Sequence, residues 1–252
     1  MEFVLSKHST VSYLLGVAIC LALWTAAAER FPSIIVPSPE ATVLAAVELA
    51  MDRSFWSMTV LPTLSRALVG GAVAATIGIG FGLIAGYSRL ANGVLEPPRL
   101  ILSAVPAPVL VILLLLWFGT NDKTIILSVA ILLTPLFFVA SRDGLRGVDT
   151  KLVEMASVYR FPLRQRLSLV VAPALAISIL PATRVGVANG LRLCILAEIL
   201  VASSGFGEEI ALSRQYLETE KLFALVLLLV LLIVCLEWSL DRLMHRNSLK
   251  PG

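Results

Sequence analysis

Charged side chains are scarce in this sequence of 252 residues. Asp, Glu, Lys and Arg make up 15% of it, hydrophobic residues make up 58%, and the mean hydropathy is +0.92. A soluble globular domain carries roughly 25% charged residues. The composition therefore excludes an ordinary soluble domain and indicates a chain that resides mainly in lipid.

Residues able to carry catalysis are also few. The two histidines, His8 and His245, lie near opposite ends of the chain. The sequence has no Gly-x-Ser-x-Gly, no His-Glu-x-x-His and no Gly-Lys-Ser/Thr ending of a phosphate loop. We therefore expect no catalytic residue, no cofactor, no metal site and no ATPase site on the chain itself.

Cysteines number only three, Cys20, Cys194 and Cys235, and all lie in apolar segments. Their odd number argues against a disulfide framework, and their spacing is not that of metal ligands. We interpret them as small buried hydrophobic residues.

What the sequence has in abundance is long apolar runs. A helix that spans a bilayer needs about 20 apolar residues, and six runs reach about that length, at 11–28, 63–87, 98–118, 123–141, 174–201 and 221–240. The sequence predicts an all-α polytopic membrane protein with six transmembrane helices in one domain, 1–252. Prolines inside the third, fourth and fifth runs predict kinks: Pro106, Pro108, Pro135, Pro173 and Pro181.

The first run has an alternative interpretation as a signal peptide, because Lys7 precedes it and Ala26-Ala27-Ala28 ends it. Its 18 residues exceed the usual signal core of about 7–15. We favour a retained anchor; the alternative leaves five spans.

Basic residues set the predicted orientation. With a cytoplasmic N-terminus, 12 of the 20 Lys and Arg residues face the cytoplasm, 6, among them Arg66, face outward and 2, Arg184 and Arg192, lie within the fifth span. Cytoplasmic loops of membrane proteins are enriched in basic residues. We therefore expect both termini in the cytoplasm.

Two further segments have recognisable patterns. Ser38-Pro39-Glu40 is a typical helix start, and it predicts an extracytoplasmic helix to about Met51 that lies along the membrane surface. In the second span, small residues recur every fourth position and predict a face for close helix packing: Gly70, Ala74, Gly78, Gly82 and Gly86.

A polar loop at 142–172 separates the fourth and fifth spans. Asp149 or Thr150 can cap a short helix, and Pro162 ends that helix or begins the next one. The residues alone leave two interpretations open: docking into a groove of a cytoplasmic partner, or attachment to anionic lipid head groups.

The loop resembles the signature loop of bacterial ABC-importer permeases, in which Glu-Ala-Ala precedes a glycine and a later proline. Glu154-Met155-Ala156 is followed after 16 residues by Pro173. The resemblance covers about residues 36–240 and includes VPSPEATVLA, ILLLLWFGT, GLRGVDTKLVEMA and AEILVASSGFG. The last segment is most similar to permeases of the nitrate, sulfonate and taurine group.

Two residues depart from the family pattern. Met155 replaces the first alanine, and Arg160 stands where the family has glycine. Because glycine adopts positive φ easily and arginine does not, we expect Pro162 rather than Arg160 to shape the bend.

The resemblance implies a set of partners in the bacterial inner membrane. Two copies of the chain, a homodimer, would form the pore, a cytoplasmic ABC ATPase dimer would bind the loops, and an extracytoplasmic binding protein would deliver the solute. Membrane lipid surrounds the spans, and no nucleic-acid partner is expected. The implied ATPase-docking residues are Glu154, Met155, Ala156 and Tyr159, with Arg160, Arg164 and Arg166 as a basic rim.

Charges within the fifth span suggest a candidate translocation path. Arg184, Arg192 and Glu198 each need water or a partner, because an unpaired charge at the bilayer centre costs about 2.5–3.5 kcal/mol or more. One hypothesis is that Arg192 and Asn189 face the cavity and favour an anion. The alternative is that Arg192 pairs with helix carbonyls or with a carboxylate at the dimer seam.

The predicted function is import of a small anion or zwitterion such as a sulfonate, taurine or nitrate. A cofactor precursor such as a thiamine pyrimidine is an alternative cargo. An ion-coupled secondary transporter is an alternative mechanism, although it would require inverted repeats that we do not find. A third alternative, a purely structural membrane protein, would give the polar loop at 142–172 no role.

Overall fold

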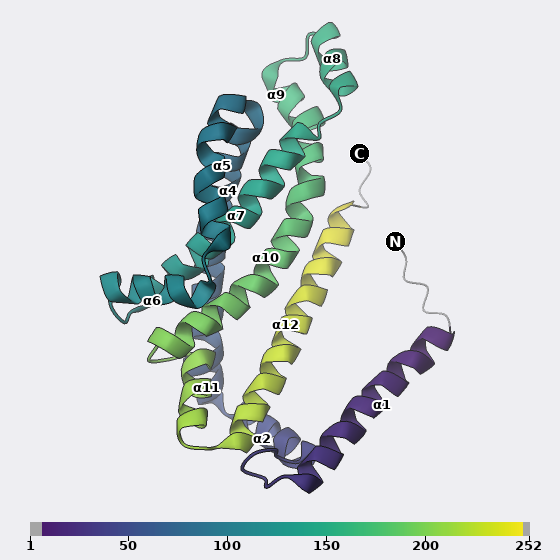
Figure 1. The fold of residues 1–252 in the computed structure, drawn as a ribbon. Coiled ribbons are helices and arrows are strands. Elements are labelled where there is room, and N and C mark those ends of the chain that lie inside the picture. The colour runs from purple at the N-terminus through teal and green to yellow at the C-terminus, as the bar shows by residue number, and fades with distance from the viewer. Residues whose placement is uncertain (1–6, 249–252) are drawn as a thin grey trace.

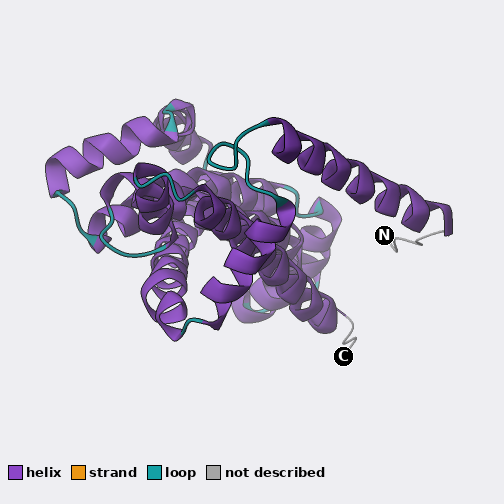
Figure 2. Cartoon of the chain, turned by 90° about the horizontal axis from the view of Figure 1, so that it is seen from below, coloured by secondary structure: helices purple, strands orange, loops and turns teal. Residues whose placement is uncertain are grey.

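A computed structural model describes residues 7–248, and within them the chain is helical throughout (Figure 1). Short loops join the helices, and no strand occurs among these residues (Figure 2). The elements are α1 (Lys7–Arg30), α2 (Pro39–Met51), α3 (Arg53–Phe55), η1 (Trp56–Val60), α4 (Leu61–Tyr87), α5 (Arg89–Ala104), α6 (Ala107–Phe118), α7 (Asp122–Arg146), α8 (Thr150–Val158), α9 (Leu163–Arg166), η2 (Leu167–Val171), α10 (Ala172–Val201), α11 (Phe206–Gln215) and α12 (Thr219–Ser248).

Four of the described helical segments are long and apolar enough to cross a membrane: Arg53–Tyr87, Asp122–Arg146, Leu163–Val201 and Thr219–Arg242. They contain the predicted second, fourth, fifth and sixth spans. The predicted first span falls on α1, and its membrane crossing stays a prediction.

The predicted third span differs from the structure. Instead of one kinked helix over 98–118, the chain forms α5 and α6, which are bent by 98° at a break of two residues. Val105 and Pro106 both have extended backbone, with ψ of 125° and 130°. A residue that precedes proline is pushed out of the helical region, and Pro106 has no N–H to continue the hydrogen-bond ladder. The proline therefore breaks the helix, and the pair counts as a fifth span only if both parts are taken together.

The two π-helical turns, η1 and η2, lie just before prolines at the starts of long helices. Pro62 cannot donate to the Met58 carbonyl one turn earlier, and Leu61 N bonds instead five residues back, to Trp56 O. η2 repeats this geometry before Pro173. Single π turns of this kind allow a helix to continue past an unmatched carbonyl.

The core lies where α4 crosses α7, with α10 packed beside both (Figure 1). The small residues of α4 make this contact close. A Cβ added at Gly78 would lie 2.6 Å from Thr134 O, and one added at Gly70 would lie 2.8 Å from Val129 Cβ. Gly82 and Gly86 face Ser141 and Leu145 in the same way, and Ala74 is fully buried.

α1 stands apart from the bundle except at its C-terminal end (Figure 1). There, Trp24 Nε1 donates to Pro37 O at 3.0 Å, and its ring lies 6.0 Å from that of Phe223 on α12. Ser38 caps α2 by accepting from Ala41 N at 3.2 Å. The loop and α2 thus tie α1 to the start of α12.

Candidate functional site

The loop after α7 contains α8, which projects beyond the other helices at one end of the bundle (Figure 1). Asp149 begins α8, because its carboxylate accepts from Lys151 N at 2.8 Å. A side-chain oxygen at this position satisfies an otherwise unpaired amide of the first turn. The helix therefore starts where the sequence predicts.

The C-terminal end of α8 corrects the expectation for Arg160. This arginine adopts φ of +50°, the left-handed conformation that we expected it to avoid. Arg160 N donates to Ser157 O at 3.0 Å, and Phe161 N donates to Ala156 O at 2.9 Å. These are the two bonds of a Schellman motif, which satisfies the last carbonyls of a helix and needs a left-handed residue at this position. The hydrogen bonds thus override the preference of arginine.

One face of α8 is apolar and exposed. Leu152, Met155 and Tyr159 share it at helical spacing, with 44%, 40% and 72% of their surfaces exposed, whereas Ala156 beside them is 2% exposed. Glu154, Arg160, Arg164 and Arg166 in the same loop are also exposed. Exposed apolar patches with polar surroundings mark sites of protein or membrane contact.

At the opposite end of the bundle the chain holds an ionic cluster, here called the ion-pair clamp, in which Asp122 is exposed and Arg66 and Glu198 are buried: Thr63, Arg66, Asp122, Glu198 and Ser204. Arg66 is 4% exposed and Glu198 is 1% exposed. The Arg66 guanidinium donates to Glu198 at 2.7 Å, to Asp122 at 2.8 Å and to Ser204 O at 2.7 Å. The clamp thus joins α4, α7, α10 and the loop before α11.

Backbone groups complete the clamp. The second Glu198 oxygen accepts from Gly207 N at 3.0 Å, and Thr63 Oγ1 donates to Glu198 and accepts from Phe206 N at 2.9 Å. The Met58 carbonyl that Pro62 leaves unmatched accepts from Gly205 N at 3.1 Å. The carboxylate therefore has hydrogen-bond donors on several sides, which a buried charge requires. Burial and the neighbouring Glu209 carboxylate raise the pKa of Glu208, on the first turn of α11.

Sequence reasoning placed Arg66 among the outward-facing basic residues and did not connect it with Glu198. The two residues are 132 positions apart, and their side chains meet only in the fold. The available signal was the cost of a lone carboxylate within a span, which demands a partner.

The other charges of α10 have different surroundings. Arg184 pairs with Asp241 on α12 at 2.9 Å. Arg192 is exposed, and its Nη1 donates to Asn189 Oδ1 at 3.2 Å. Arg192 forms no ion pair with any of the described side chains. The structure thus brings Asn189 and Arg192 together and leaves the Arg192 charge without a carboxylate partner among the described side chains.

A family model for "Binding-protein-dependent transport system inner membrane component" matches residues 78–248, which is 171 of the 252 residues (248 − 78 + 1). The chain belongs to this family. It is a permease subunit of an importer-type ABC transporter and a component of the inner membrane.

Two relatives resemble this permease over nearly its full length. The candidate aliphatic sulfonates transport permease protein SsuC of Bacillus subtilis is 30% identical over 97% of this chain and 88% of its own. The taurine transport system permease protein TauC of Escherichia coli is 23% identical over 96% of this chain and 90% of its own. Among solved structures, a chain of the MetNI methionine ABC transporter in an inward-facing conformation matches with a TM-score of 0.65 at 16% identity, over 78% of this chain and 99% of that one. That likeness establishes the fold of the permease.

Between its long helices the permease has an apolar cavity of about 330 Å³. Leu68, Gly71 and Ala75 of α4, Gly186 and Leu191 of α10 and Leu236 of α12 line it. Thr183 is its one hydroxyl-bearing residue. The cavity lies beside the α4–α10 contact, one residue from Arg192 along α10.

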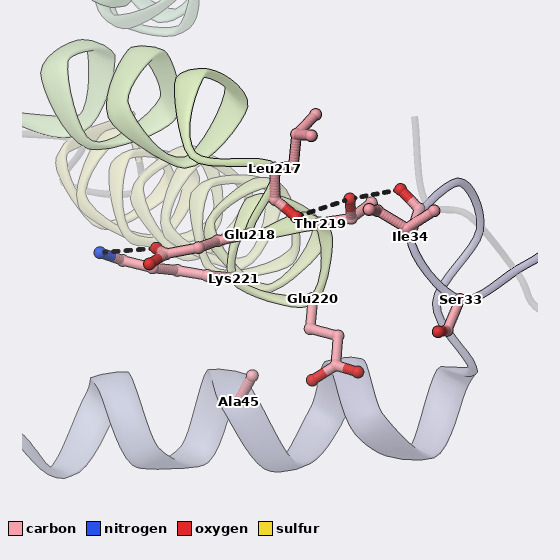
Figure 3. A pocket seen from close by; sticks show the side chains of 8 residues that line it. All are labelled: Ser33, Ile34, Ala45, Leu217, Glu218, Thr219, Glu220 and Lys221. Carbon is pink, nitrogen blue, oxygen red and sulfur yellow. Dashed lines mark hydrogen bonds and ion pairs between the residues drawn. The ribbon is translucent and has the colours of Figure 1, made fainter.

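A second, more open pocket of about 600 Å³ lies where the turn between α11 and α12 meets α2 (Figure 3). Thr219 Oγ1 donates to Ile34 O at 2.6 Å, and Lys221 pairs with Glu209 and Glu218 at 2.9 and 3.7 Å. The Glu220 side chain extends toward α2 (Figure 3). This end of the permease therefore presents an acidic, hollowed surface.

Proposed function

We propose that α8 is the helix through which a cytoplasmic ATPase drives this permease, and that the permease imports a small sulfonate- or taurine-like solute. The observation that carries the proposal is the exposed apolar face of α8, formed by Leu152, Met155 and Tyr159. An apolar face on a nine-residue helix that projects from a bundle requires a partner that covers it.

A soluble protein suits this face better than lipid does. Met155 and Tyr159 bring a flexible side chain and an aromatic ring, both of which are enriched at the centres of protein interfaces. Arg160, Arg164 and Arg166 follow in the same loop and are exposed. Such an arrangement, an apolar centre with a charged rim, is typical of a specific protein interface.

The energy source follows from the same arrangement. The permease sequence carries no Walker-type phosphate loop, so ATP hydrolysis takes place on the partner. α8 joins α7 to the long segment Leu163–Val201 through short connections. Movement of α8 by the ATPase would therefore be passed to both helices. Two copies of the permease, arranged as a homodimer, would line one pathway.

This assignment places α8 and both termini in the cytoplasm, and it places α2, α11 and the pocket of Figure 3 outside. The acidic outer surface, with Glu218 and Glu220 at its rim, is where a solute-binding protein would dock. Positively charged side chains on that protein would complement it.

The cargo proposal rests on two observations. The names of the two full-length relatives refer to aliphatic sulfonates and taurine. Arg192 supplies a positive charge on a spanning helix and has no carboxylate partner in the part of the chain that the structure describes. We infer that Arg192, oriented by Asn189, attracts the sulfonate group in the pathway, which distinguishes sulfonates from uncharged cofactor precursors.

Met155→Glu tests the docking role. A carboxylate at the centre of the apolar face should reduce co-purification of the ATPase and solute uptake by roughly 100-fold, because burying an unpaired charge costs several kcal/mol. Met51→Glu is the matched control, since Met51 is an exposed methionine at the end of α2, on the other side of the membrane. Equal ATPase recovery with both variants would contradict the proposal.

Arg192→Leu tests the cargo role separately. Uptake of taurine and alkyl sulfonates should fall at least 10-fold while the ATPase still co-purifies, because only the attraction for the anion is lost. Arg184→Leu is the control, because Arg184 is already paired with Asp241. If Arg192→Leu leaves the uptake of sulfonates, taurine and nitrate unchanged, Arg192 has no role in the pathway.

A further inference from the structure

Two pockets lie along one face of α5, here together called the α5 groove, and these two halves differ in chemistry. Near the start of α5 lies a polar pocket of about 500 Å³ lined by Gly86, Tyr87, Arg89, Asn92 and Arg146. Further along the same face, at Leu95, Arg99 and Leu102, lies a second pocket of about 290 Å³ with apolar walls. Positions 89, 92, 95, 99 and 102 recur at helical spacing and form one stripe.

The polar half carries uncompensated positive charge. No acidic residue lines it, and neither Arg89 nor Arg146 forms an ion pair with any carboxylate among the described side chains. Arg146 is held in place by donating to Ala85 O at 3.0 Å. Two arginines with free donors in one pocket fit the oxygens of a phosphate group.

The neighbouring arginines, Arg99 and Arg142, have their charges neutralised by carboxylates of the same chain. Glu96 lies between the two halves and accepts from Arg99 at 2.7 Å and from Arg142 at 2.5 Å. Asp143 also pairs with Arg142, at 2.8 Å. These charges cancel within the chain, so the positive charge of Arg89 and Arg146 remains for a ligand.

The apolar half indicates the other part of that ligand. Ile77 and Phe81 of α4 and Ile131 and Phe138 of α7 form walls opposite Leu95 and Leu102. Arg89 and Leu102 are 13 residues apart, which is about 20 Å along a helix. One leaflet of the hydrocarbon core is about 15 Å thick, half of about 30 Å. The exposed Tyr87 beside Arg89 is a typical marker of the membrane interface.

We propose that this groove binds an anionic phospholipid, with the phosphate on Arg89 and Arg146 and an acyl chain against α4, α5 and α7. The charge complementarity selects an anionic head group, and the apolar walls of the second pocket select a lipid over a soluble anion. The α4–α5 turn lies at the same end of the bundle as α8 (Figure 1), so the lipid would belong to the same leaflet. The proposal does not depend on the cargo.

The test measures lipid retained by the full-length chain in detergent, by native mass spectrometry, with phosphatidylglycerol and phosphatidylcholine of identical acyl chains. One arginine near an anionic lipid contributes roughly fivefold in affinity, so two predict a preference for phosphatidylglycerol of roughly 25-fold. Arg89→Gln with Arg146→Gln should abolish that preference. The control pair Arg53→Gln with Arg214→Gln changes the net charge equally, at exposed positions, and should keep it.

A second variant tests the apolar half and remains informative if the double variant does not fold. Leu102→Trp should lower retention of phosphatidylglycerol several-fold by filling the groove. Retention unchanged in both Arg89→Gln/Arg146→Gln and Leu102→Trp would overturn the proposal. Displacement of the lipid by excess inorganic phosphate would also overturn it, because it would identify a site for a free anion.

Discussion

The ion-pair clamp and α8 both place polar residues in an otherwise apolar chain, but they differ in which side chains are buried and which are exposed. In the clamp, Arg66 and Glu198 are buried and find their partners within the chain. On α8, Met155 and Tyr159 are apolar and lie exposed. A region whose charges are paired internally holds the subunit together, whereas a region with uncovered apolar surface is suited to contact another molecule.

The clamp and α8 also differ in which residue adopts a positive φ. In the clamp, Gly205 takes φ of +108°, and an added Cβ would lie 2.5 Å from Glu198 Oε1. Glycine is required there both by conformation and by space. On α8 an arginine takes φ of +50° with its side chain exposed. Conformational strain is thus tolerated where the side chain stays accessible to a partner.

Removing one partner of the clamp should have the largest effect. Glu198→Ala leaves Arg66 buried without its main counter-charge, and it should lower the free energy of unfolding by about 3–5 kcal/mol. Thermal unfolding in detergent measures this. Glu154→Ala, which removes an exposed carboxylate of α8, should change stability by less than about 0.5 kcal/mol.

A double variant sharpens this result. Arg66→Met combined with Glu198→Leu removes both charges and should recover much of the loss, because an apolar pair of similar size is tolerated at buried ion pairs. If Glu198→Ala lowers the free energy of unfolding as little as Glu154→Ala does, the clamp and α8 do not differ in their contribution to stability.

Packing between α4 and α7 gives a second, smaller test on the buried side. Gly78→Ala should destabilise the protein by about 1–3 kcal/mol, because its Cβ would meet Thr134 O at 2.6 Å. Gly80 lies two residues away, and a Cβ added there would have no heavy atom within 4 Å. Gly80→Ala should therefore stabilise the helix by up to about 1 kcal/mol. Denaturation of the two variants side by side measures the difference. Equal effects would show that the small residues of α4 do not determine its contact with α7.

The smallest effect belongs to the end of α8. Arg160→Gly relieves the left-handed conformation and should stabilise the turn by about 1 kcal/mol, which slows hydrogen exchange of the Phe161 amide roughly fivefold. Arg164→Gly, inside α9, should have the opposite sign because glycine weakens a helix interior. Faster exchange in Arg160→Gly would mean that the arginine side chain itself stabilises the turn.

The helices themselves could largely be predicted from the sequence. The apolar runs at 123–141 and 174–201 lie within α7 and α10, and Ser38-Pro39 marks the start of α2. These features depend on local pattern: long apolar stretches and a capping residue before a proline. Local pattern also narrowed the cap of α8 to Asp149 or Thr150, and Asp149 is the residue that caps it.

The errors arose where competing forces act over a longer range. Pro106 was expected to kink a helix, but it separates α5 from α6 by 98°. Arg160 was expected to avoid positive φ, but the two hydrogen bonds at the end of α8 impose it. The Arg66–Glu198 pair was missed, because only the tertiary fold brings the carboxylate of α10 to Arg66 on α4.

Uptake of taurine into proteoliposomes that contain the permease, its ATPase and its binding protein is the decisive measurement of the proposed import. We expect uptake that requires ATP and the binding protein, and that Met155→Glu abolishes. Uptake driven by an ion gradient in vesicles that contain the permease alone would contradict it.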